Sequence, residues 1–417
     1  MDAFGSTEKS RRSLTVIAAV LALLVCLFSC SADGPAWRAG DMREQTMVLY
    51  PRVFADWQHS SSQAQTTSAT GEKLWFVPNQ EGGATGYPAV MVVTEAGLTV
   101  QYGDRFRQLR FDGTVAWEIA IDPGLAIFAD TKAIYYLGPD LTLQGMTFER
   151  RAILGEYSIP RCGPRGSVVM VQPRGNKYFL MQTYNRAREM VVDDPPESDS
   201  YHLMLKRAEE RTEVDWLHDF EGSALPGLVT HDNSRVVLLT PAGRVTVFDI
   251  ASGKTVGSFD IPKAGLQQAS LDHNDQLVIL LYDAEAHPTL VSYSLAGERR
   301  WSFLLPPAGR LGAVQPPAIG ADNRAAHIWG DTLWVVAEGA LKWRCPVPPS
   351  RFAQYVTLLG DNSLLLTAAN AVLHLDADGA LLFETYFKPE EQVTTPAVVD
   401  GGGRIYVGTT AGIHCLN

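Results

Sequence analysis

The sequence contains none of the residue spacings that mark the common catalytic and metal-binding sites. Its nine histidines are scattered without an HxH or HExxH pattern, and no CxxC pair occurs. No GxSxG element for a nucleophilic serine is present. The glycine-rich stretch DGGGR at 400–404 lacks the Lys-Ser/Thr that completes a phosphate-binding loop. We therefore expect no metal, no cofactor and no catalytic residue, and hence a protein that is not an enzyme.

Charged residues are also scarce, at 19% of the 417 residues, and acidic residues outnumber basic ones by 46 to 35. The formal net charge of −11 is opposite in sign to the basic footprint that nucleic-acid binding requires. Hydrophobic residues make up 46% of the chain, which is enough to bury a sizeable core. The composition predicts a folded protein with no nucleic-acid partner, and we expect the protein to be a monomer.

The first 30 residues differ from the rest of the chain. A basic head precedes 17 uncharged residues at 14–30, which is the pattern of an export signal. The run ends in Leu-Phe-Ser-Cys and resembles the lipobox of bacterial lipoproteins, so we expect residues 1–29 to be removed and Cys30 to carry lipid. The resemblance and Ser31 together imply an outer-membrane lipoprotein. An uncleaved N-terminal membrane anchor and plain secretion, with cleavage after Ala32, remain alternatives.

Residues 30–71 are poor in apolar side chains and include QHSSSQAQTTSATG, which predicts a flexible linker between the anchor and the folded body. Three cysteines remain in the body, Cys162, Cys345 and Cys415, and each is in or beside an expected strand. We interpret them as buried small hydrophobes, with a single disulfide left open.

From residue 72 onward, short β-rich runs alternate with turns, and the pattern repeats. Large residues near the end of each repeat fall mostly 40 to 44 residues apart, with one gap of 59: Trp75, Trp117, Tyr157, Trp216, Phe259, Trp301, Trp343 and Phe383. This period, with four strands per unit, is typical of a β-propeller. The predicted fold is all-β: an eight-bladed β-propeller of four-stranded antiparallel blades over residues 72–417. Seven blades is the fallback, because the second and third units are degenerate.

The two ends of this region predict how the ring closes. Residues 396–417 supply only three strands of a last blade, and 72–78 form a lone leading strand. Pairing the two removes an open sheet edge. The residues expected at this ring closure are Trp75, Phe76, Ile413 and Cys415.

A family resemblance follows from three stretches, VFDIASGKTVGSFDIP, HLDADGALLFETY and VVDGGGRIYVGTTAGIHCLN. They resemble the quinoprotein-type (PQQ-like) repeat, over roughly residues 72–417. The resemblance implies one of two branches: quinone-dependent dehydrogenases, or non-catalytic propellers such as the BamB family of outer-membrane assembly lipoproteins. The dehydrogenases carry an adjacent Cys-Cys pair, which this chain lacks after its signal. The sequence is therefore more similar to the BamB branch.

Two further features allow a functional and a structural interpretation. Asp272, His273 and Asp275 could suggest a metal, but Asp, Asn and Gly recur at this place in other units as turn formers. The stretch 185–202 interrupts the third unit and is bordered by basic residues, so it is either a solvated insertion or a loop that docks a partner. The residues expected to dock are Arg186, Arg188, Met190, Val191 and Val192.

These observations predict a lipid-anchored, non-catalytic propeller that acts as a protein-interaction scaffold in the bacterial cell envelope, periplasmic or surface-exposed. Its expected partners are proteins, with a component of the outer-membrane barrel-assembly machinery as the candidate that the resemblance implies. The alternative is a small-ligand-binding or quinone-dependent, oxidoreductase-like propeller that uses the central channel. A repeat predicts a fold, and a fold by itself does not determine which of these functions applies.

Overall fold

The computed structural model describes the strands and turns of the body of the chain, all within residues 41–417. For β6 to β13 the structure describes the backbone. Of the side chains on these strands it describes only those of Trp216 and His218. The described residues are 63, 65–79, 88, 90–94, 97–102, 105–120, 127–129, 133–137, 142–147, 153–158, 165–171, 178–185, 200–207, 216–220, 227–240, 242–261, 268–282, 287–307, 315–347 and 355–417.

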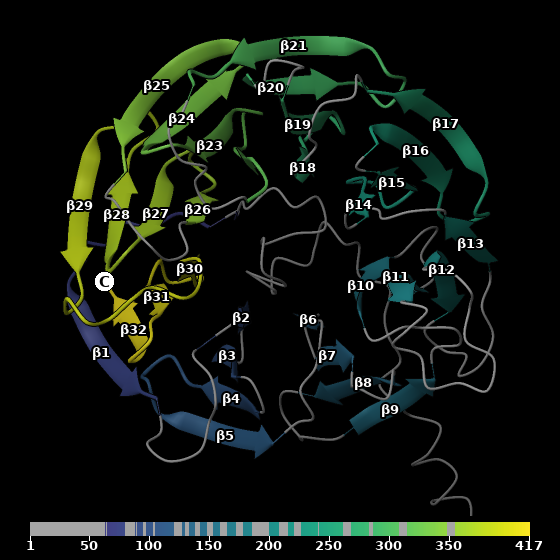
Figure 1. Cartoon of the computed structure of the whole chain (residues 1–417). Coiled ribbons are helices and arrows are strands. Elements are labelled where there is room, and N and C mark those ends of the chain that lie inside the picture. Colours follow the sequence, from purple (N-terminus) through teal and green to yellow (C-terminus); the bar gives the residue numbers. More distant parts are fainter. Residues whose placement is uncertain are drawn as a thin grey trace, which may run out of the picture. The chain divides into compact units, whose positions relative to one another are not determined.

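The described strands form eight four-stranded antiparallel sheets, seven of which take their strands in chain order (Figure 1). Four of the seven are β2 (Val90–Thr94) with β3 (Gly97–Tyr102), β4 (Arg105–Leu109) and β5 (Val115–Ala120); β6 (Ile127–Ala129) with β7 (Ala133–Leu137), β8 (Thr142–Thr147) and β9 (Ile153–Ser158); β10 (Arg165–Val171) with β11 (Tyr178–Asn185), β12 (Ser200–Arg207) and β13 (Trp216–Phe220); and β14 (Leu228–Val229) with β15 (Arg235–Leu239), β16 (Arg244–Asp249) and β17 (Thr255–Asp260).

The remaining three are β18 (Gln268–Leu271) with β19 (Leu277–Tyr282), β20 (Pro288–Tyr293) and β21 (Arg299–Leu304); β22 (Ala318–Ile319) with β23 (Ala325–Trp329), β24 (Thr332–Ala337) and β25 (Ala340–Pro346); and β26 (Tyr355–Leu358) with β27 (Leu364–Ala368), β28 (Ala371–Leu375) and β29 (Leu381–Tyr386). The eighth, called the closing sheet below, is β30 (Val398–Val399), β31 (Ile405–Gly408), β32 (Gly412–Leu416) and β1 (Lys73–Pro78). The described part of the chain contains no helix, and hence none that could span a membrane.

The closing sheet takes its fourth strand from the opposite end of the described chain. β1 runs antiparallel to β32, with Trp75 opposite Cys415 and Val77 opposite Ile413 (Figure 1). This is the pairing that the sequence argument placed between residues 72–78 and 412–417. It provides backbone hydrogen-bond partners for a strand, β32, that would otherwise end the sheet as a bare apolar edge.

Four sheets whose side chains are described bury apolar residues on both faces by packing against their neighbours: the β18–β21, β22–β25, β26–β29 and closing sheets. One hydrophobic cluster joins the β22–β25 sheet to the β26–β29 sheet, and another joins the β26–β29 sheet to the closing sheet. A third cluster joins the closing sheet to the β2–β5 sheet, through residues such as Tyr406 and Tyr102. The first strands of neighbouring sheets also contact each other, as β2 does with β6 and β30. Stacking of this kind is how a two-faced sheet becomes stable.

Six of the eight large aromatic residues that set the sequence period have one packing role in common. Each of the six lies on a fourth strand and packs against a glycine in the turn between the third and fourth strands of the next sheet: Trp75, Trp216, Phe259, Trp301, Trp343 and Phe383. Trp75 packs on Gly113 in this way, and Trp343 packs on Gly379. The indole Nε1 of Trp343 also donates to the carbonyl of Ala377 in that turn, at 2.9 Å. A β-carbon on Gly379 would lie 2.7 Å from the indole ring, so the aromatic residue requires a glycine partner.

Residues before β1 differ from the expected linker. The sequence assigned all of 30–71 to a flexible tether, whereas Gln63 and Thr67 are buried and residue 71 is hydrogen-bonded to Asn417. Their side chains are short or polar, so hydropathy could not reveal that they pack. The ordered body therefore begins before residue 72.

Substitution of Gly379 by alanine tests the aromatic–glycine contact. Gly379 has φ +87°, and its new β-carbon would collide with the Trp343 indole, so we expect a loss of about 1–3 kcal/mol in the free energy of unfolding. Denaturant unfolding monitored by tryptophan fluorescence would measure this loss. Gly401→Ala is the matched control, because no atom lies within 4 Å of its added β-carbon. Equal stability of both variants would contradict the packing role.

Candidate functional site: the turn surface and the closing sheet

The turns between the first and second strands of the sheets are built alike. They are called the first turns, and five of them are described, at 230–235, 272–276, 320–324, 359–363 and 400–404. In each, the residue in the fourth position donates its N–H to the carbonyl of the first, as Asn323 does to Gly320. That residue is in the left-handed region, with φ from 56° to 81°. Asn, Asp and Gly tolerate this conformation best, which explains the turn sequences.

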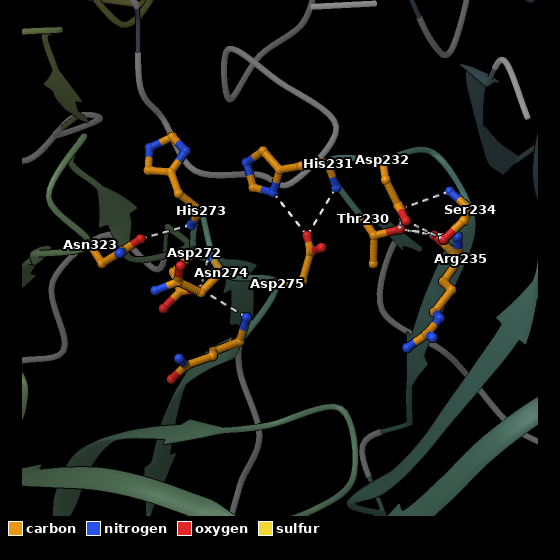
Figure 2. A network of polar contacts seen from close by, with 11 residues as sticks. Thr230, His231, Asp232, Ser234, Arg235, Asp272, His273, Asn274, Asp275 and Asn323 are labelled. Carbon is orange, nitrogen blue, oxygen red and sulfur yellow. Dashed lines mark hydrogen bonds and ion pairs between the residues drawn. The ribbon is translucent and has the colours of Figure 1, made fainter.

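Hydrogen bonds join one first turn to the next. The backbone N–H of His231 donates to Oδ1 of Asp275, and that of His273 donates to Oδ1 of Asn323, each at 2.9 Å (Figure 2). The N–H of Asp322, one position later in its turn, donates to Oδ1 of Asn362 at 3.3 Å. At Asp275, Asn323 and Asn362 the left-handed residue thus has two roles, since it shapes its own turn and accepts a bond from the turn of the preceding sheet. Sequence reasoning found the turns but missed these bonds between sheets.

The candidate metal residues belong to this turn network. The carboxylate of Asp272 accepts the backbone N–H groups of Asn274 and Gln276, within its own turn. Burial raises the pKa of Asp272, and these two hydrogen bonds partly offset that effect. Asp275 accepts both the backbone N–H and the ring Nδ1 of His231, at 2.9 Å each. The turn interpretation accounts for these residues, and no described group of three or more His, Cys, Asp or Glu could hold a metal ion.

Replacement of Asp275 separates its two roles. Asp275→Asn keeps the acceptor and the left-handed propensity, as at Asn323 and Asn362, so we expect a change within about 0.5 kcal/mol in the free energy of unfolding. Asp275→Ala removes both, and we expect a loss of about 1–2 kcal/mol. Denaturant unfolding at pH 7.5 measures both variants. A loss in Asp275→Asn as large as that in Asp275→Ala would show that the charge, and not the turn bond, matters.

The four residues expected at the ring closure lie together on the β1–β32 pair. Trp75 donates from Nε1 to the carbonyl of Phe111 at 3.2 Å, and so reaches the β2–β5 sheet. Phe76 packs against the ring of His414, with 4.5 Å between centroids. Ile413 and Cys415 are fully buried. Trp75, Ile413 and Cys415 belong to the hydrophobic cluster that joins the closing sheet to the β2–β5 sheet.

A buried polar cluster, which sequence reasoning missed, supports the same sheet. The Tyr406 hydroxyl and the Arg404 Nε both donate to Oδ2 of Asp400, at 2.7 and 2.8 Å. Arg404 also donates to the carbonyl of Phe111, at 3.1 Å. Burial raises the pKa of Tyr406 and raises that of the Cys415 thiol to about 12. Both groups stay protonated near neutral pH, so this cluster offers structural bonds and no activated nucleophile.

A second buried pair joins His414 to Glu391, with 2.7 Å between Nε2 and Oε2. The imidazole lies between the rings of Phe76 and Phe387, with centroids 4.5 and 4.4 Å away. Burial lowers the pKa of His414, and the nearby carboxylate opposes that effect. Glu391 precedes the sheet in a loop, so no local sequence pattern could have linked it to His414.

The remaining sequence predictions meet the structure only in part. Cys345 is half-buried and Cys415 is buried, and both are free thiols, while Cys162 lies outside the described residues. The lipidation residue Cys30 also lies outside them. So do the expected docking residues, Arg186, Arg188, Met190, Val191 and Val192. Their flanks are described: Asn185 of β11 pairs with Ser200 of β12, at the end of the sheet opposite to the first turns.

All large apolar side chains that the described structure exposes lie on fourth strands. They are Leu74 and Phe76 on β1, Val115 on β5, Val256 on β17, Leu304 on β21, Leu341 on β25, and Leu381, Leu382 and Tyr386 on β29. β1 and β29 are linked, because Nζ of Lys73 donates to the carbonyl of Tyr386 at 2.8 Å. Five of the nine side chains are therefore on two linked strands. We call this set of exposed side chains the apolar rim.

His327 allows a test of the pH response of the core. It is buried on β23, and desolvation lowers its pKa from 6.5 to about 4. The unfolded chain takes up the proton at the higher pH, so stability falls as the pH drops through 6.5 and levels off near 4. Relative to His327→Leu, we expect the native protein to lose about 3 kcal/mol more between pH 7.5 and 4. Parallel pH-dependence in the two proteins, measured by denaturant unfolding, would contradict this.

Comparison with known proteins gives the fold and no family. No family model matches the chain, and no curated protein matches it either. Solved structures do match: BamB from Moraxella catarrhalis has a TM-score of 0.54 and 11% identity, covering 82% of this chain and 96% of that one. Sqt1 from Chaetomium thermophilum, bound to the N-terminus of the ribosomal protein L10, has a TM-score of 0.51 and 12% identity, over 84% and 98%.

A quinohemoprotein alcohol dehydrogenase from Comamonas testosteroni is similar as well, with a TM-score of 0.56 and 10% identity, over 90% of this chain and 81% of that one. At such identities the similarity shows the fold alone. The expected fold class is confirmed as an all-β propeller of four-stranded antiparallel sheets. The similar structures include an enzyme and proteins of other kinds, so they leave the activity of this chain open.

Proposed function

We propose that this chain is a non-catalytic propeller that binds protein partners in the bacterial cell envelope. In this proposal a lipid on Cys30 holds it at the outer membrane, and a component of the barrel-assembly machinery is its partner. The observation that carries the protein-binding part is the apolar rim, whose members lie on fourth strands. Exposed apolar side chains that gather on one part of a surface favour a contact with another protein.

The fourth strands suit such a contact for a second reason. Among the described strands, the fourth strand of each sheet pairs with a neighbouring strand on one side and forms the outer edge on the other. The backbone of such an edge can pair with an extended segment of a partner, while its exposed side chains supply specificity. Lys73 on β1, Glu384 on β29 and Arg300 on β21 are charged residues on these strands, and charges at edge strands restrain unspecific pairing.

The first turns and the closing sheet support a scaffold role in another way. The carboxylates of Asp272 and Asp400 are engaged with backbone groups or side chains of the same clusters. Fixed turns give a rigid frame that positions binding loops. The envelope location and the barrel-assembly partner rest on the resemblance of the repeat to the BamB family and on the N-terminal signal. Within the stretch 185–202, residues 186–199, which connect β11 to β12, are the proposed docking loop.

A pull-down tests the proposal. The full-length protein, lipidated in its native membranes, would be isolated in detergent and its partners identified by mass. We expect a barrel-assembly protein to be recovered, and its recovery to fall at least tenfold when Arg186 and Arg188 are both changed to glutamate, because opposite charge disrupts electrostatic docking. Arg235→Glu with Lys254→Glu, at exposed positions outside the fourth strands, is the control of equal charge change.

Two outcomes would contradict parts of this proposal. Recovery unaffected by the Arg186 and Arg188 changes, and by replacement of 186–199 with an Asn-Gly turn, would remove the docking loop. Absence of any barrel-assembly protein would remove the assembly role. A saturable absorbance change of pyrroloquinoline quinone with calcium and purified protein would instead support the oxidoreductase-like alternative.

A further inference from the structure

The bonds between neighbouring first turns change at the closing sheet. In the preceding sheets the acceptor is the side chain of the left-handed residue, Asp275, Asn323 or Asn362. At the equivalent place the closing sheet has Gly403, with φ +81° and no side chain. The donor is still present. It is the N–H of Gly360, which has the same position in the first turn of the β26–β29 sheet as His273 has in its own turn. Its acceptor is the carbonyl of Gln65, at 3.1 Å.

Residues before β1 therefore take the place of a missing side chain. A β-carbon on Gly403 would lie 3.6 Å from the Thr66 carbonyl oxygen and 3.7 Å from Cα of Thr67. The hydroxyl of Thr67 donates to the carbonyl of Gly403. An asparagine at 403 would direct its amide into the space that these residues fill. The glycine and the segment that covers it are thus complementary.

The same segment completes an interrupted turn. In the β2–β5 sheet, Gly113 donates to the carbonyl of Arg110, and Arg110 donates to that of Thr114. In the closing sheet, Gly71 donates to the carbonyl of Asn417 at 2.6 Å, and Asn417 donates to that of Glu72 at 2.8 Å. The hydrogen bonds match, although the two halves of this turn come from opposite ends of the described chain.

An aromatic ring also packs on the glycine of this matched turn, as in the other sheets. Gly71 has φ +79°, and its β-carbon position is 2.5 Å from the ring of Phe383 on β29. This is the contact that Gly379 makes with Trp343 one sheet earlier. Thr385 adds a hydrogen bond from its hydroxyl to the carbonyl of Gly71, at 2.7 Å. Gly71 is therefore the turn glycine of the closing sheet.

At the other end of the segment, Gln63 is bound to the first strands of two sheets, β26 and β30. Its N–H donates to the carbonyl of Leu358 at 2.8 Å, and its side-chain Oε1 accepts the N–H of Val399 at 2.9 Å. From 65 to 71 exposed and less exposed residues alternate, as in an extended strand, with Thr67, Ala69 and Gly71 directed inward. The segment crosses from β26 and β30 to β29 and β1.

We infer that Gln63 and residues 65–71, called the clasp, act as a built-in peptide ligand of a groove between the β26–β29 sheet and the closing sheet. The groove recognises an extended peptide through backbone groups of Leu358, Gly360 and Val399 at one end and through Phe383 and Asn417 at the other. Its specificity comes from a Gln, a Thr and a Gly at fixed spacing, and its occupant is this chain's own clasp. Closure of the propeller thus depends on a segment that precedes its first strand.

Hydrogen exchange of the full-length protein tests the clasp. Gly403→Asn restores the side-chain acceptor and competes with Gln65 for the Gly360 N–H. We expect amides of the peptide that spans residues 63–72 to exchange at least tenfold faster in this variant, with β27 and β31 unchanged. Gly401→Asn is the matched control in the same turn, where no atom lies within 4 Å of the added β-carbon, and it should leave exchange as in the native protein. Native exchange in Gly403→Asn would overturn the inference.

A peptide supplied in trans gives an independent test. In a second variant, residues 63–71 of the full chain are replaced by a Gly-Ser segment of equal length. A fluorescently labelled peptide, QAQTTSATG, should bind this variant saturably and the native protein at least tenfold more weakly, because the native groove is occupied. A peptide with Thr67 and Gly71 both changed to valine should not bind. If the variant keeps its β-sheet circular dichroism but binds neither peptide, the groove does not recognise the clasp.

Discussion

The two apolar faces of each sheet are the constraint on which the rest of the structure depends. A four-stranded sheet such as β26–β29 can bury both faces only between two neighbours, and the clusters that join successive sheets show this arrangement. A row of such sheets would still end in two exposed faces. The β1–β32 pair resolves this, because it completes a sheet that packs on the β26–β29 sheet on one side and on the β2–β5 sheet on the other.

Contacts at two kinds of turn then position each sheet against the next. The aromatic–glycine contacts set one sheet against the next at the turn between the third and fourth strands. The first turns add a bond from each sheet to the following one, through a left-handed Asp or Asn. At the closing sheet both devices are supplied by residues before β1, since Gly71 is the turn glycine and Gln65 the acceptor. Closure is therefore reinforced at two positions besides strand pairing.

The placement of polar and apolar side chains also bears on function. The buried acids of the described residues, Asp272, Glu391 and Asp400, are engaged in turns or in the closing sheet. The fourth strands, in contrast, are the outer edges of the described sheets and carry the apolar rim. A protein partner fits these features better than a small substrate does. That preference is the physical basis of the proposed scaffold role. The proposed envelope location rests, in addition, on the resemblance of the repeat.

The amino-acid sequence by itself determined the all-β fold, the four-stranded unit, and the pairing of the leading strand with the last one. These follow from short-range patterns: alternating apolar residues, Asn, Asp and Gly at turns, and an aromatic residue at a regular period. It also predicted the turn role of Asp272 and Asp275, because the same residue types recur at the same place. A contact that repeats in every unit leaves a trace in the sequence each time.

Only the tertiary structure decided which polar residues meet. The His414–Glu391 pair, the bond from Arg404 to the Phe111 carbonyl, and the clasp each join residues that are distant in sequence and occur once, so no repetition reveals them. The clasp shows the reason most clearly. Gln63 and Thr67 are buried although they are polar, because partners elsewhere in the chain satisfy their hydrogen bonds. A sequence pattern reports hydropathy and local conformation, whereas satisfaction of a buried polar group depends on distant atoms that only folding brings near.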